Sequence, residues 1–386
     1  MCVPPEPARL SVTFALHEPN LITLPPPLYR PLLDSSVAAT EADLQRYDWS
    51  TLFYDVFVRD RVLYLLGPPL LALESIALTV HCNGAALALQ RDKLVSIAEK
   101  LLIWTAPLPD QGGAELYNVE ICFALARVRL VLADCAEPPR RPERVLVTLQ
   151  RDNAPRWIAD WIAWYAEQHG VERVLIYDNR SAYQAELGPR LAAELARCQG
   201  GLGANSALRS VTVVPWNVPF GMIINYNHNN FFAQHGALNH AARRFARRGD
   251  VLFNFDVDEL LVCPRAELGR LLRERALLYF DSYWVPIVQQ LPALPEHYSF
   301  DAFALREPRP RGKFHKWVMR WDGAAKLCLH TVLERRPLVV PISTAYYLHY
   351  RGITTFWKKD IYRQGAAKAE IDQRYALASP SGLVPI

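Results

Sequence analysis

The sequence predicts an α/β protein with a mostly parallel sheet and flanking helices, preceded by a smaller, mainly β domain. Beyond about residue 145, short apolar runs alternate with helical patterns, which is typical of a parallel sheet covered on both faces. Before about residue 140, short β-type runs are separated by turn residues. The stretch 136–143 between them holds three prolines and four charged residues, the composition of a linker. A chain of 386 residues is long enough for two domains, which we expect at 1–140 and 141–386.

The elements of the first domain are expected to be short strands. Asn83-Gly84 lies between two apolar runs and predicts a hairpin, because these residues tolerate the positive φ angles of a type I′ turn. The expected strands span residues 10–16, 62–66, 76–82, 85–90, 119–123 and 128–132.

The second domain is expected to alternate strands with helices. Trp157, Trp161 and Trp164 recur at helical spacing and give one helix an apolar face, which Gly170 would terminate. Asp152 or Asn153 supplies a cap-type residue, and Pro155 suits the first turn. The expected strands span 145–149, 174–177, 211–214, 251–255 and 283–288, and the expected helices span 157–169, 184–198 and 229–248. In such sheets, ligands bind at the carboxyl ends of the strands.

Composition narrows the classes of function. The net charge of +4, from 43 basic and 39 acidic residues, gives no reason to expect a nucleic-acid partner. No apolar run reaches the ~18–20 residues of a membrane span, and we expect no secretory signal. The seven cysteines are scattered without CxxC spacing, which favours reduced thiols in a cytoplasmic protein.

The strongest local signal is an apolar strand that runs directly into Asp256-Val257-Asp258-Glu259. Burying acids at a strand end is costly unless they are paired or bind a cation. Two carboxylates at this spacing can hold one divalent ion, which takes further ligands from the phosphates of a substrate. The alternative is a solvated junction between strand and loop.

Polar loops also follow the two preceding strands. Gln150-Arg151-Asp152-Asn153 follows the first, and Asp178-Asn179-Arg180-Ser181 follows the second. Asp178 occupies the position where an acid meets a ribose or a base edge in nucleotide-binding sheets. The alternative is a plain β-turn, since Asp, Asn and Ser all favour turns. Neither GxGxxG nor GxxxxGK[ST] occurs, so dinucleotide and P-loop sites have no support.

Several of these motifs occur in an order that resembles glycosyltransferase family 92 and the family-2-like GT-A glycosyltransferases. The resemblance covers roughly residues 145–363. The sequence departs from the family pattern at three places. Ala154 and Asp160 each stand where the family usually has Glu, and no Phe-Gly follows the strand 283–288. The last departure lies in the expected acceptor region and puts the acceptor in doubt. The matching motifs are Asn153-Ala154-Pro155, Trp157–Trp161, His169–Val171, Tyr177–Ser181, Phe255–Leu260, Lys316–Arg320, His330 and Leu348–Gly352.

The resemblance implies a GT-A fold and a metal-dependent transferase. The donor would be a nucleotide sugar, a UDP-linked hexose, and the acceptor a glycan or a lipid-linked sugar. The cofactor would be Mn²⁺ or Mg²⁺. The implied metal ligands are Asp256, Asp258 and His349, and the implied donor-binding residues are Arg151, Asn153, Asp178, Asp256, Lys316 and Arg320. For His349, the alternative is a packed core histidine among Tyr346, Tyr347 and Tyr350.

Transfer with inversion needs a general base for the acceptor hydroxyl. Glu307 is preferred over Glu296 and Asp322, while a retaining mechanism, which needs no such base, stays open. Gln234 lies in a stretch rich in amides and imidazoles and is the predicted contact to the donor sugar in the active site; its alternative is a polar helix face.

Two other classes of function remain open from the sequence. One is a nucleotidyltransferase on a similar sheet, and the other is a non-catalytic carbohydrate-binding or scaffold protein. The basic segment 356–374 is expected to close over the diphosphate, with peripheral contact to an anionic membrane left as the alternative.

Overall fold

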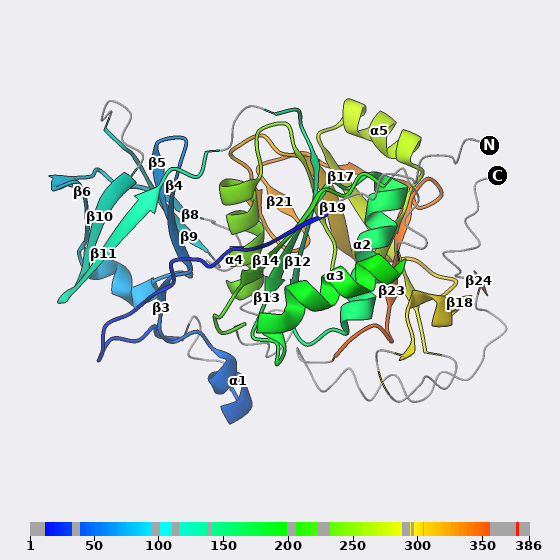
Figure 1. Ribbon diagram of the computed structural model, residues 1–386, viewed down its shortest axis with the longest axis horizontal. Coiled ribbons are helices and arrows are strands. Elements are labelled where there is room, and N and C mark those ends of the chain that lie inside the picture. The colour runs from blue at the N-terminus through cyan, green and yellow to red at the C-terminus, as the bar shows by residue number, and fades with distance from the viewer. Residues whose placement is uncertain are drawn as a thin grey trace, which may run out of the picture. The chain divides into compact units, whose positions relative to one another are not determined.

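The computed structural model describes residues 12–32, 39–93, 101–109, 116–136, 140–198, 206–221, 232–287, 294, 297–303, 305–355 and 376–377 (Figure 1). The chain forms two compact units. Unit 1 comprises Met1–His17, Pro142–Pro215 and Ala246–Ile386, and unit 2 comprises Glu18–Arg141 and Trp216–Phe245.

The predicted boundary at 140/141 falls beside the step from Arg141 to Pro142. Two segments depart from the predicted division. The strand at Thr13–Leu16 pairs with Ser210–Pro215 and so joins the large sheet of unit 1. The segment Trp216–Phe245 belongs to unit 2, because buried polar contacts attach it there. Both departures depend on contacts between residues far apart in the chain.

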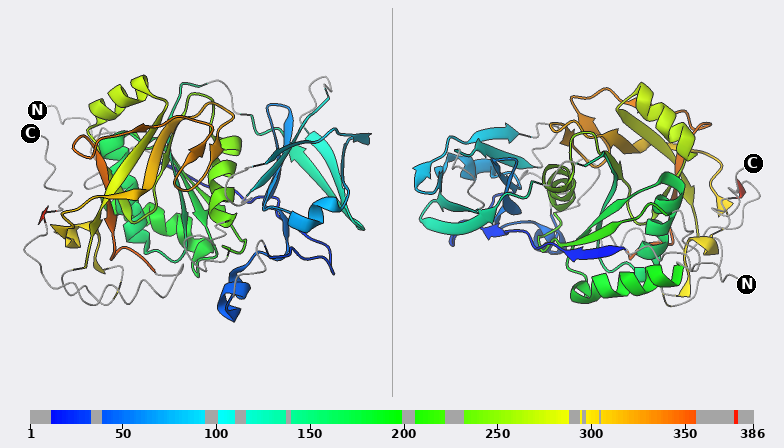
Figure 2. Two further views of the ribbon diagram at one scale, coloured as in Figure 1. Left: turned by 180° about the vertical axis from the view of Figure 1, so that it is seen from behind. Right: turned by 45° about the horizontal axis from the view of Figure 1, so that its top comes forward.

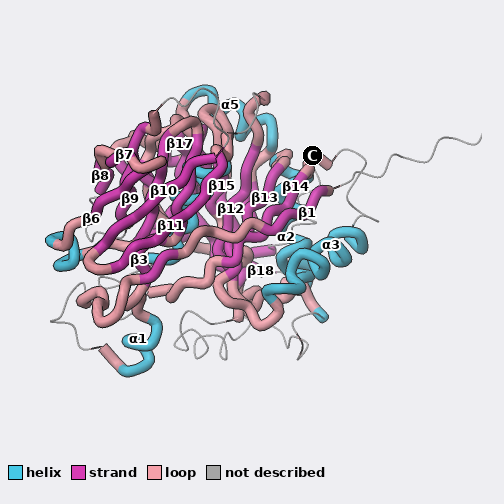
Figure 3. Tube along the Cα trace, turned by 60° about the vertical axis from the view of Figure 1, so that its left-hand side comes forward, coloured by secondary structure: helices cyan, strands magenta, loops and turns pink. Residues whose placement is uncertain are grey.

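Unit 1 is a mixed α/β unit built on a large, mainly parallel sheet. Five strands run parallel on one side of it, in the order β1 (Thr13–Leu16), β14 (Ser210–Pro215), β13 (Arg173–Asp178), β12 (Arg144–Gln150) and β15 (Val251–Asn254). Figure 3 shows these strands side by side. Residues 145–150 are all buried, as expected for a strand covered on both faces.

The sheet continues beyond β15 with mixed strand directions. β19 (Arg311–Arg320) runs antiparallel to β15 and to β17 (Leu277–Val285). β17 pairs in parallel with β23 (Tyr346–Tyr350), and β16 (Glu259–Val262) closes the order antiparallel to β23. The view from behind in Figure 2 shows these later strands in yellow to orange. Short pairings add β22 (Leu338–Val339) beside β17, β20 (Lys326–Leu327) with β21 (Val332–Leu333), and β18 (Leu305–Arg306) with β24 (Ala376–Leu377).

The helices of unit 1 cover the sheet with apolar faces. α2 (Pro155–His169) buries Trp157 and Trp161, and Gly170 ends it in the left-handed conformation at φ 63°, as predicted. The expected cap is wrong: Ala154 occupies that position and no side chain caps the helix. Among the residues that the structure describes, the helical elements of unit 1 include α2, η2 (Gln184–Glu186), α3 (Leu187–Cys198), α5 (Arg265–Glu274) and η5 (Phe300–Ala302).

In its described residues, unit 2 contains two four-stranded antiparallel sheets that share one apolar core, and a short antiparallel pairing of β2 (Ile22–Thr23) with β3 (Thr51–Phe53). The first has the order β4 (Asp55–Arg59), β5 (Val62–Gly67), β9 (Leu102–Pro107) and β8 (Gln90–Lys93). The second has the order β11 (Ala126–Ala133), β10 (Leu116–Phe123), β6 (Leu78–Cys82) and β7 (Ala85–Ala86). The remaining elements are α1 (Glu41–Arg46), η1 (Leu71–Ser75), α4 (Phe232–His240) and the π-helical turn η3 (Ala241–Phe245).

The hairpin at Asn83-Gly84 is confirmed. Both residues have positive φ, at 48° and 84°, and Cys82 pairs with Ala85 across the turn. The strand expected at 85–90 is shorter than predicted, because β7 ends at Ala86 and β8 begins only at Gln90.

A buried carboxylate attaches α4 and η3 to the strands of unit 2. Asp55 on β4 accepts hydrogen bonds from His240 Nε2 at 2.7 Å, from Arg244 at 3.0 Å and from the Asn20 backbone N–H at 2.7 Å. Burial alone would raise the pKa of Asp55, but the His240 and Arg244 contacts outweigh it and hold the pKa below its ordinary value.

Among the described residues, no helix combines the length and apolar character that crossing a bilayer requires.

The buried His169 predicts a loss of stability in acid. Its Nε2 donates to the Leu261 carbonyl at 2.9 Å, and Nδ1 has no hydrogen-bond partner among the described residues. Burial lowers the pKa of His169 to about 4. The unfolded chain, with an imidazole pKa of about 6.5, therefore binds more protons between pH 6.5 and 4, and stability falls with pH by up to about 3 kcal/mol in that window.

Replacing the ring tests this dependence. We expect His169→Gln to have a shallower decline of unfolding free energy between pH 6.5 and 4 than the unaltered protein, measured by urea denaturation at each pH. His297→Gln, at an exposed position, is the control and should leave the slope unchanged. Equal slopes for all three proteins would contradict the assignment of a neutral His169.

Candidate functional site

The carboxyl ends of three parallel strands lie at one edge of the large sheet. Gln150 on β12 pairs with Asp178 on β13, and Val147 pairs with Asn254 at the end of β15. Because these strands are parallel neighbours, the loops that follow them emerge on the same side. The polar motifs after 149, 177 and 255 therefore meet at this edge, where open α/β sheets bind ligands.

The acidic motif forms a tight turn between β15 and β16. The Glu259 backbone N–H donates to the Asp256 carbonyl at 3.0 Å. In return, the Asp256 N–H donates to Glu259 Oε2 at 2.8 Å. These two bonds close the turn and fix the direction of the Glu259 side chain.

Lys316 on β19 is buried against this turn. Its Nζ lies 3.0 Å from Asp256 Oδ2 and 2.9 Å from Glu259 Oε2, and only 1% of its side chain is exposed. Burial works against the charged form, but the two carboxylates outweigh it and raise the pKa of Lys316. Two of its three N–H donors are thus used within the protein. The structure places Lys316 on carboxylates, whereas the resemblance implied a diphosphate contact.

Asp258, Glu259 and His349 offer ligand atoms that all lie within 4.8 Å of one another. Glu259 pairs with His349 in the register of β16 and β23, and His349 Nε2 lies 3.2 Å from Asp258 Oδ2. The side chains of Asp258 and His349 are 22% and 30% exposed, so solvent reaches the group. At metal–ligand bonds of about 2.1 Å, neighbouring octahedral ligands lie roughly 3 Å apart. The donor set therefore fits one divalent cation.

This grouping changes the predicted ligand set. Glu259 stands in it where Asp256 was expected, and Asp256 pairs with Lys316. Burial raises the pKa of Glu259 to about 7, against the opposing attraction of Lys316. For His349, burial disfavours the charged ring, yet the Asp258 carboxylate outweighs it and raises the pKa. Glu259 could have been found from the sequence as an acid that directly precedes the apolar run 260–262.

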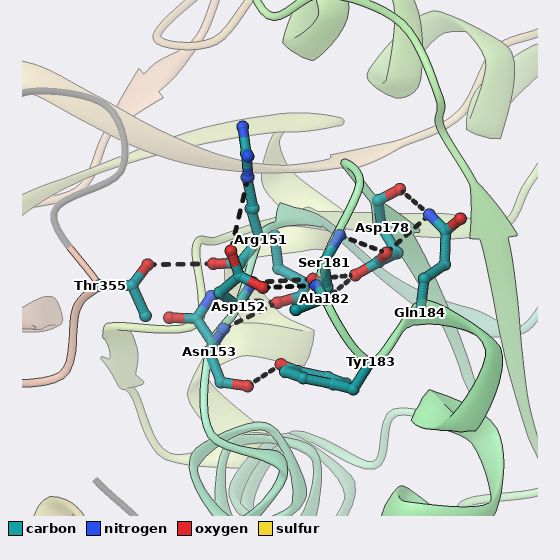
Figure 4. Close-up of polar contacts among 10 residues, drawn as sticks. Arg151, Asp152, Asn153, Asp178, Ser181, Ala182, Tyr183, Gln184 and Thr355 are labelled. Atoms are coloured by element: carbon teal, nitrogen blue, oxygen red, sulfur yellow. Dashed lines mark hydrogen bonds and ion pairs between the residues drawn. The ribbon is translucent and has the colours of Figure 1, made fainter. Parts of the chain in front are cut away.

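Asp178 is fully buried and surrounded by donors (Figure 4). It accepts from the Ser181 N–H at 3.1 Å, the Ser181 hydroxyl at 2.6 Å and Gln184 Nε2 at 2.7 Å, and also from Gln150 Nε2. Burial raises its pKa despite these bonds. The arrangement indicates that Asp178 shapes the loop, whereas the sequence predicted a direct contact to a nucleotide.

Arg151 and Asn153 lie in the adjoining loop after β12 (Figure 4). The Asn153 N–H and Nδ2 approach Gln150 Oε1 at 3.2 and 3.4 Å. Arg151 Nε lies 3.5 Å from Asp152 Oδ2, and its side chain is 41% exposed. The Thr355 hydroxyl donates to the Arg151 carbonyl at 3.0 Å. Both predicted residues therefore lie at the ligand edge of the sheet, and Arg151 reaches solvent there.

Glu307 is linked through Trp284 to the group formed by Asp258, Glu259 and His349. The Glu307 N–H donates to the Trp284 carbonyl at 2.7 Å, and the Trp284 ring centroid lies 6.1 Å from that of His349. Arg311 pairs with Glu307 Oε2 at 2.9 Å and lies over the Trp284 ring at 4.6 Å. Arg351 lies over the same ring at 4.4 Å. The sequence analysis assigned no role to Trp284, Arg311 or Arg351, although Arg351 lies within the matching motif Leu348–Gly352.

Two predicted residues of unit 1 lie away from this group. Arg320 pairs with Val251 at the amino end of β15 and donates to the Leu272 carbonyl at 2.7 Å, so it occupies the opposite edge of the sheet. Asp322 follows it and binds the backbone N–H groups of the turn at 324–325. Gln234 is buried on α4, which belongs to unit 2. The alternative base Glu296 and the basic segment 356–374 lie outside the described residues.

The chain matches no protein-family model and no curated protein. Among solved structures, histidinol dehydrogenase from Elizabethkingia anophelis is similar over 22% of this chain and 20% of its own, with a TM-score of 0.16 and 14% identity. Amylomaltase from Corynebacterium glutamicum is similar over 32% of this chain and 21% of its own, with a TM-score of 0.15 and 10% identity. The chain thus spans only about a fifth of either protein.

Lys316 is expected to be essential for the stability of unit 1. Lys316→Met leaves the buried Glu259 and the partly exposed Asp256 without their cation, which costs about 3–5 kcal/mol. Urea denaturation at pH 8 measures this loss, and adding Glu259→Gln to the variant should recover part of it. Lys326→Met is the matched control; Lys326 pairs at 3.2 Å with a largely exposed Glu334, so its loss should cost under about 1 kcal/mol. Similar costs for both lysines would contradict the prediction.

Proposed function

We propose that the protein is a metal-dependent glycosyltransferase that moves a hexose from a UDP-linked donor to a hydroxyl of a glycan or lipid-linked acceptor. The observation that supports this most is the grouping of Asp258, Glu259 and His349 ligand atoms within 4.8 Å at the carboxyl edge of the parallel strands. The order of motifs that resembles the GT-A glycosyltransferases of family 92 supports it further.

The proposed cation site is formed by Asp258, Glu259 and His349. When Mn²⁺ or Mg²⁺ is bound, it offsets the negative charge of the diphosphate leaving group. Lys316 contributes indirectly, because it neutralises Asp256 and one Glu259 oxygen and so holds the acidic turn in place.

The nucleotide would bind along the loops after β12 and β13. The bonds from Ser181 and Gln184 to Asp178 hold one loop in shape before any ligand arrives, which lowers the cost of ordering it. Arg151, at 41% side-chain exposure, is a cationic side chain at this edge that would meet the nucleotide directly.

Glu307 is the proposed general base. Its carboxylate pairs with Arg311, which lies over the Trp284 ring. The Trp284 ring in turn lies near that of His349. Trp284 and His349 are on β17 and β23, which are neighbouring strands of the sheet. Glu307 would accept the proton of the acceptor hydroxyl as that oxygen attacks the anomeric carbon, and the Arg311 contact would orient it.

Removing a proposed metal ligand should abolish transfer. We expect Asp258→Asn and His349→Ala each to lower kcat/KM at least about 100-fold with Mn²⁺, because the leaving group loses its charge compensation. A panel of nucleotide sugars assayed for nucleoside diphosphate release measures this. The controls are Asp301→Asn and His297→Ala, two exposed positions of unit 1 that should retain activity. If no nucleotide sugar binds or is hydrolysed with Mn²⁺, the proposal is wrong.

Glu307→Gln separates proton transfer from donor binding. We expect kcat to fall about 10²–10⁴-fold while calorimetry shows unchanged affinity for the donor, since the amide cannot take a proton. Glu334→Gln, at a side chain 66% exposed, is the control. Full activity of Glu307→Gln would remove Glu307 from the mechanism without touching the proposed metal site.

A further inference from the structure

The second sheet of unit 2 has one face in the core and one face open. On β10, the residues at 117, 119, 121 and 123 are buried, and the residues between them are not. The same alternation on β6 buries Val80 and Cys82 and leaves His81 on the open face. Glu120, Cys122 and His81 therefore share a face that contributes nothing to the core.

These three residues are close neighbours on that face. Glu120 lies directly opposite His81 in the antiparallel register of β10 and β6, and Cys122 is two residues further along β10. The Cys122 Sγ lies 3.9 Å from Glu120 Oε1. One ligand atom from each residue lies within 4.8 Å of the other two. In a tetrahedral zinc site with bonds of about 2.0–2.3 Å, ligand atoms are roughly 3.5 Å apart. A small side-chain adjustment would therefore close the site.

Arginine side chains next to the three residues orient the Glu120 carboxylate. The Arg129 Nε donates to Glu120 Oε2 at 2.8 Å, so the other oxygen, Oε1, faces Cys122. Arg127 Nε lies 3.6 Å from Oε1. His81 Nδ1 is buried and has no hydrogen-bond partner among the described residues. Partners such as Arg129 orient a ligating carboxylate, as outer contacts do in known metal sites.

We propose that His81, Glu120 and Cys122 form a second metal site that takes zinc or a similar divalent transition ion. The imidazole, one carboxylate oxygen and the Cys122 thiolate supply three ligands, and water supplies the fourth. On binding, the Cys122 thiol releases its proton to solvent as the sulfur–metal bond forms. The thiolate distinguishes this site from the group in unit 1, whose oxygen-rich ligands suit harder ions.

Cobalt titration of the full-length protein tests this site. Thiolate-bound Co²⁺ gives an intense near-ultraviolet charge-transfer band, whereas Co²⁺ held by Asp258, Glu259 and His349 cannot, because those residues carry no sulfur. We expect the band to appear in the unaltered protein, to disappear on addition of Zn²⁺, and to be lost in Cys122→Ser. Cys135→Ser is the control, since Cys135 is another half-buried thiol of unit 2 outside the group.

Two further measurements keep the proposal falsifiable if a variant folds poorly. His81→Ala should weaken Co²⁺ binding at least about tenfold while leaving the Cys122 thiol in place. In the unaltered protein, Zn²⁺ should slow alkylation of Cys122, and not of Cys135, as read by peptide mass spectrometry. Absence of the band, a band that survives in Cys122→Ser, an unchanged Co²⁺ affinity in His81→Ala, or equal alkylation with and without Zn²⁺ would each overturn the proposal.

Discussion

The geometry of the ligand edge depends on one buried ammonium group. Lys316 Nζ lies 3.0 and 2.9 Å from two carboxylates and is almost completely excluded from water. Taking the Lys316 ammonium and the Glu259 carboxylate out of water is costly, and their mutual attraction, with that of the partly exposed Asp256, repays that cost only when the groups are held in place. The turn 256–259 is therefore fixed to β19 through Asp256 and Glu259, while the Asp258 side chain contacts His349 on β23.

The buried carboxylates at this edge of the sheet are stabilised in two different ways. The acidic turn uses a charge of opposite sign, whereas the Asp178 loop uses only neutral donors from Ser181, Gln184 and Gln150. The first leaves Asp258 and His349 partly exposed, and the second leaves its carboxylate fully enclosed. The exposed pair is thus available to a ligand, while the enclosed carboxylate maintains the shape of the loop.

Features with a local cause could be predicted from the sequence. The apolar face of α2, its end at Gly170 and the hairpin at Asn83-Gly84 each follow from neighbouring residues. The alternation of strands and helices likewise predicted the parallel half of the sheet. The position of Lys316, the pairing of β1 with β14 and the contact of Asp55 with His240 could not be predicted, because they join residues 60 to nearly 200 positions apart. Glu259 directly precedes an apolar run, which marks it as an acid at the start of a buried strand, but its pairing with His349 depends on β23, about 90 positions later in the chain.

The interleaved division of the chain has a consequence for synthesis on the ribosome. The chain passes from one unit to the other after His17, Arg141, Pro215 and Phe245, so no single cut separates the two units. Unit 2 has all its residues once Phe245 has emerged, while β17, β19 and β23 of unit 1 are still to be made. Since domains fold as units during synthesis, unit 2 can complete its core first. Asp256 and Glu259 of unit 1, in contrast, lack their buried cation until Lys316 has been synthesised.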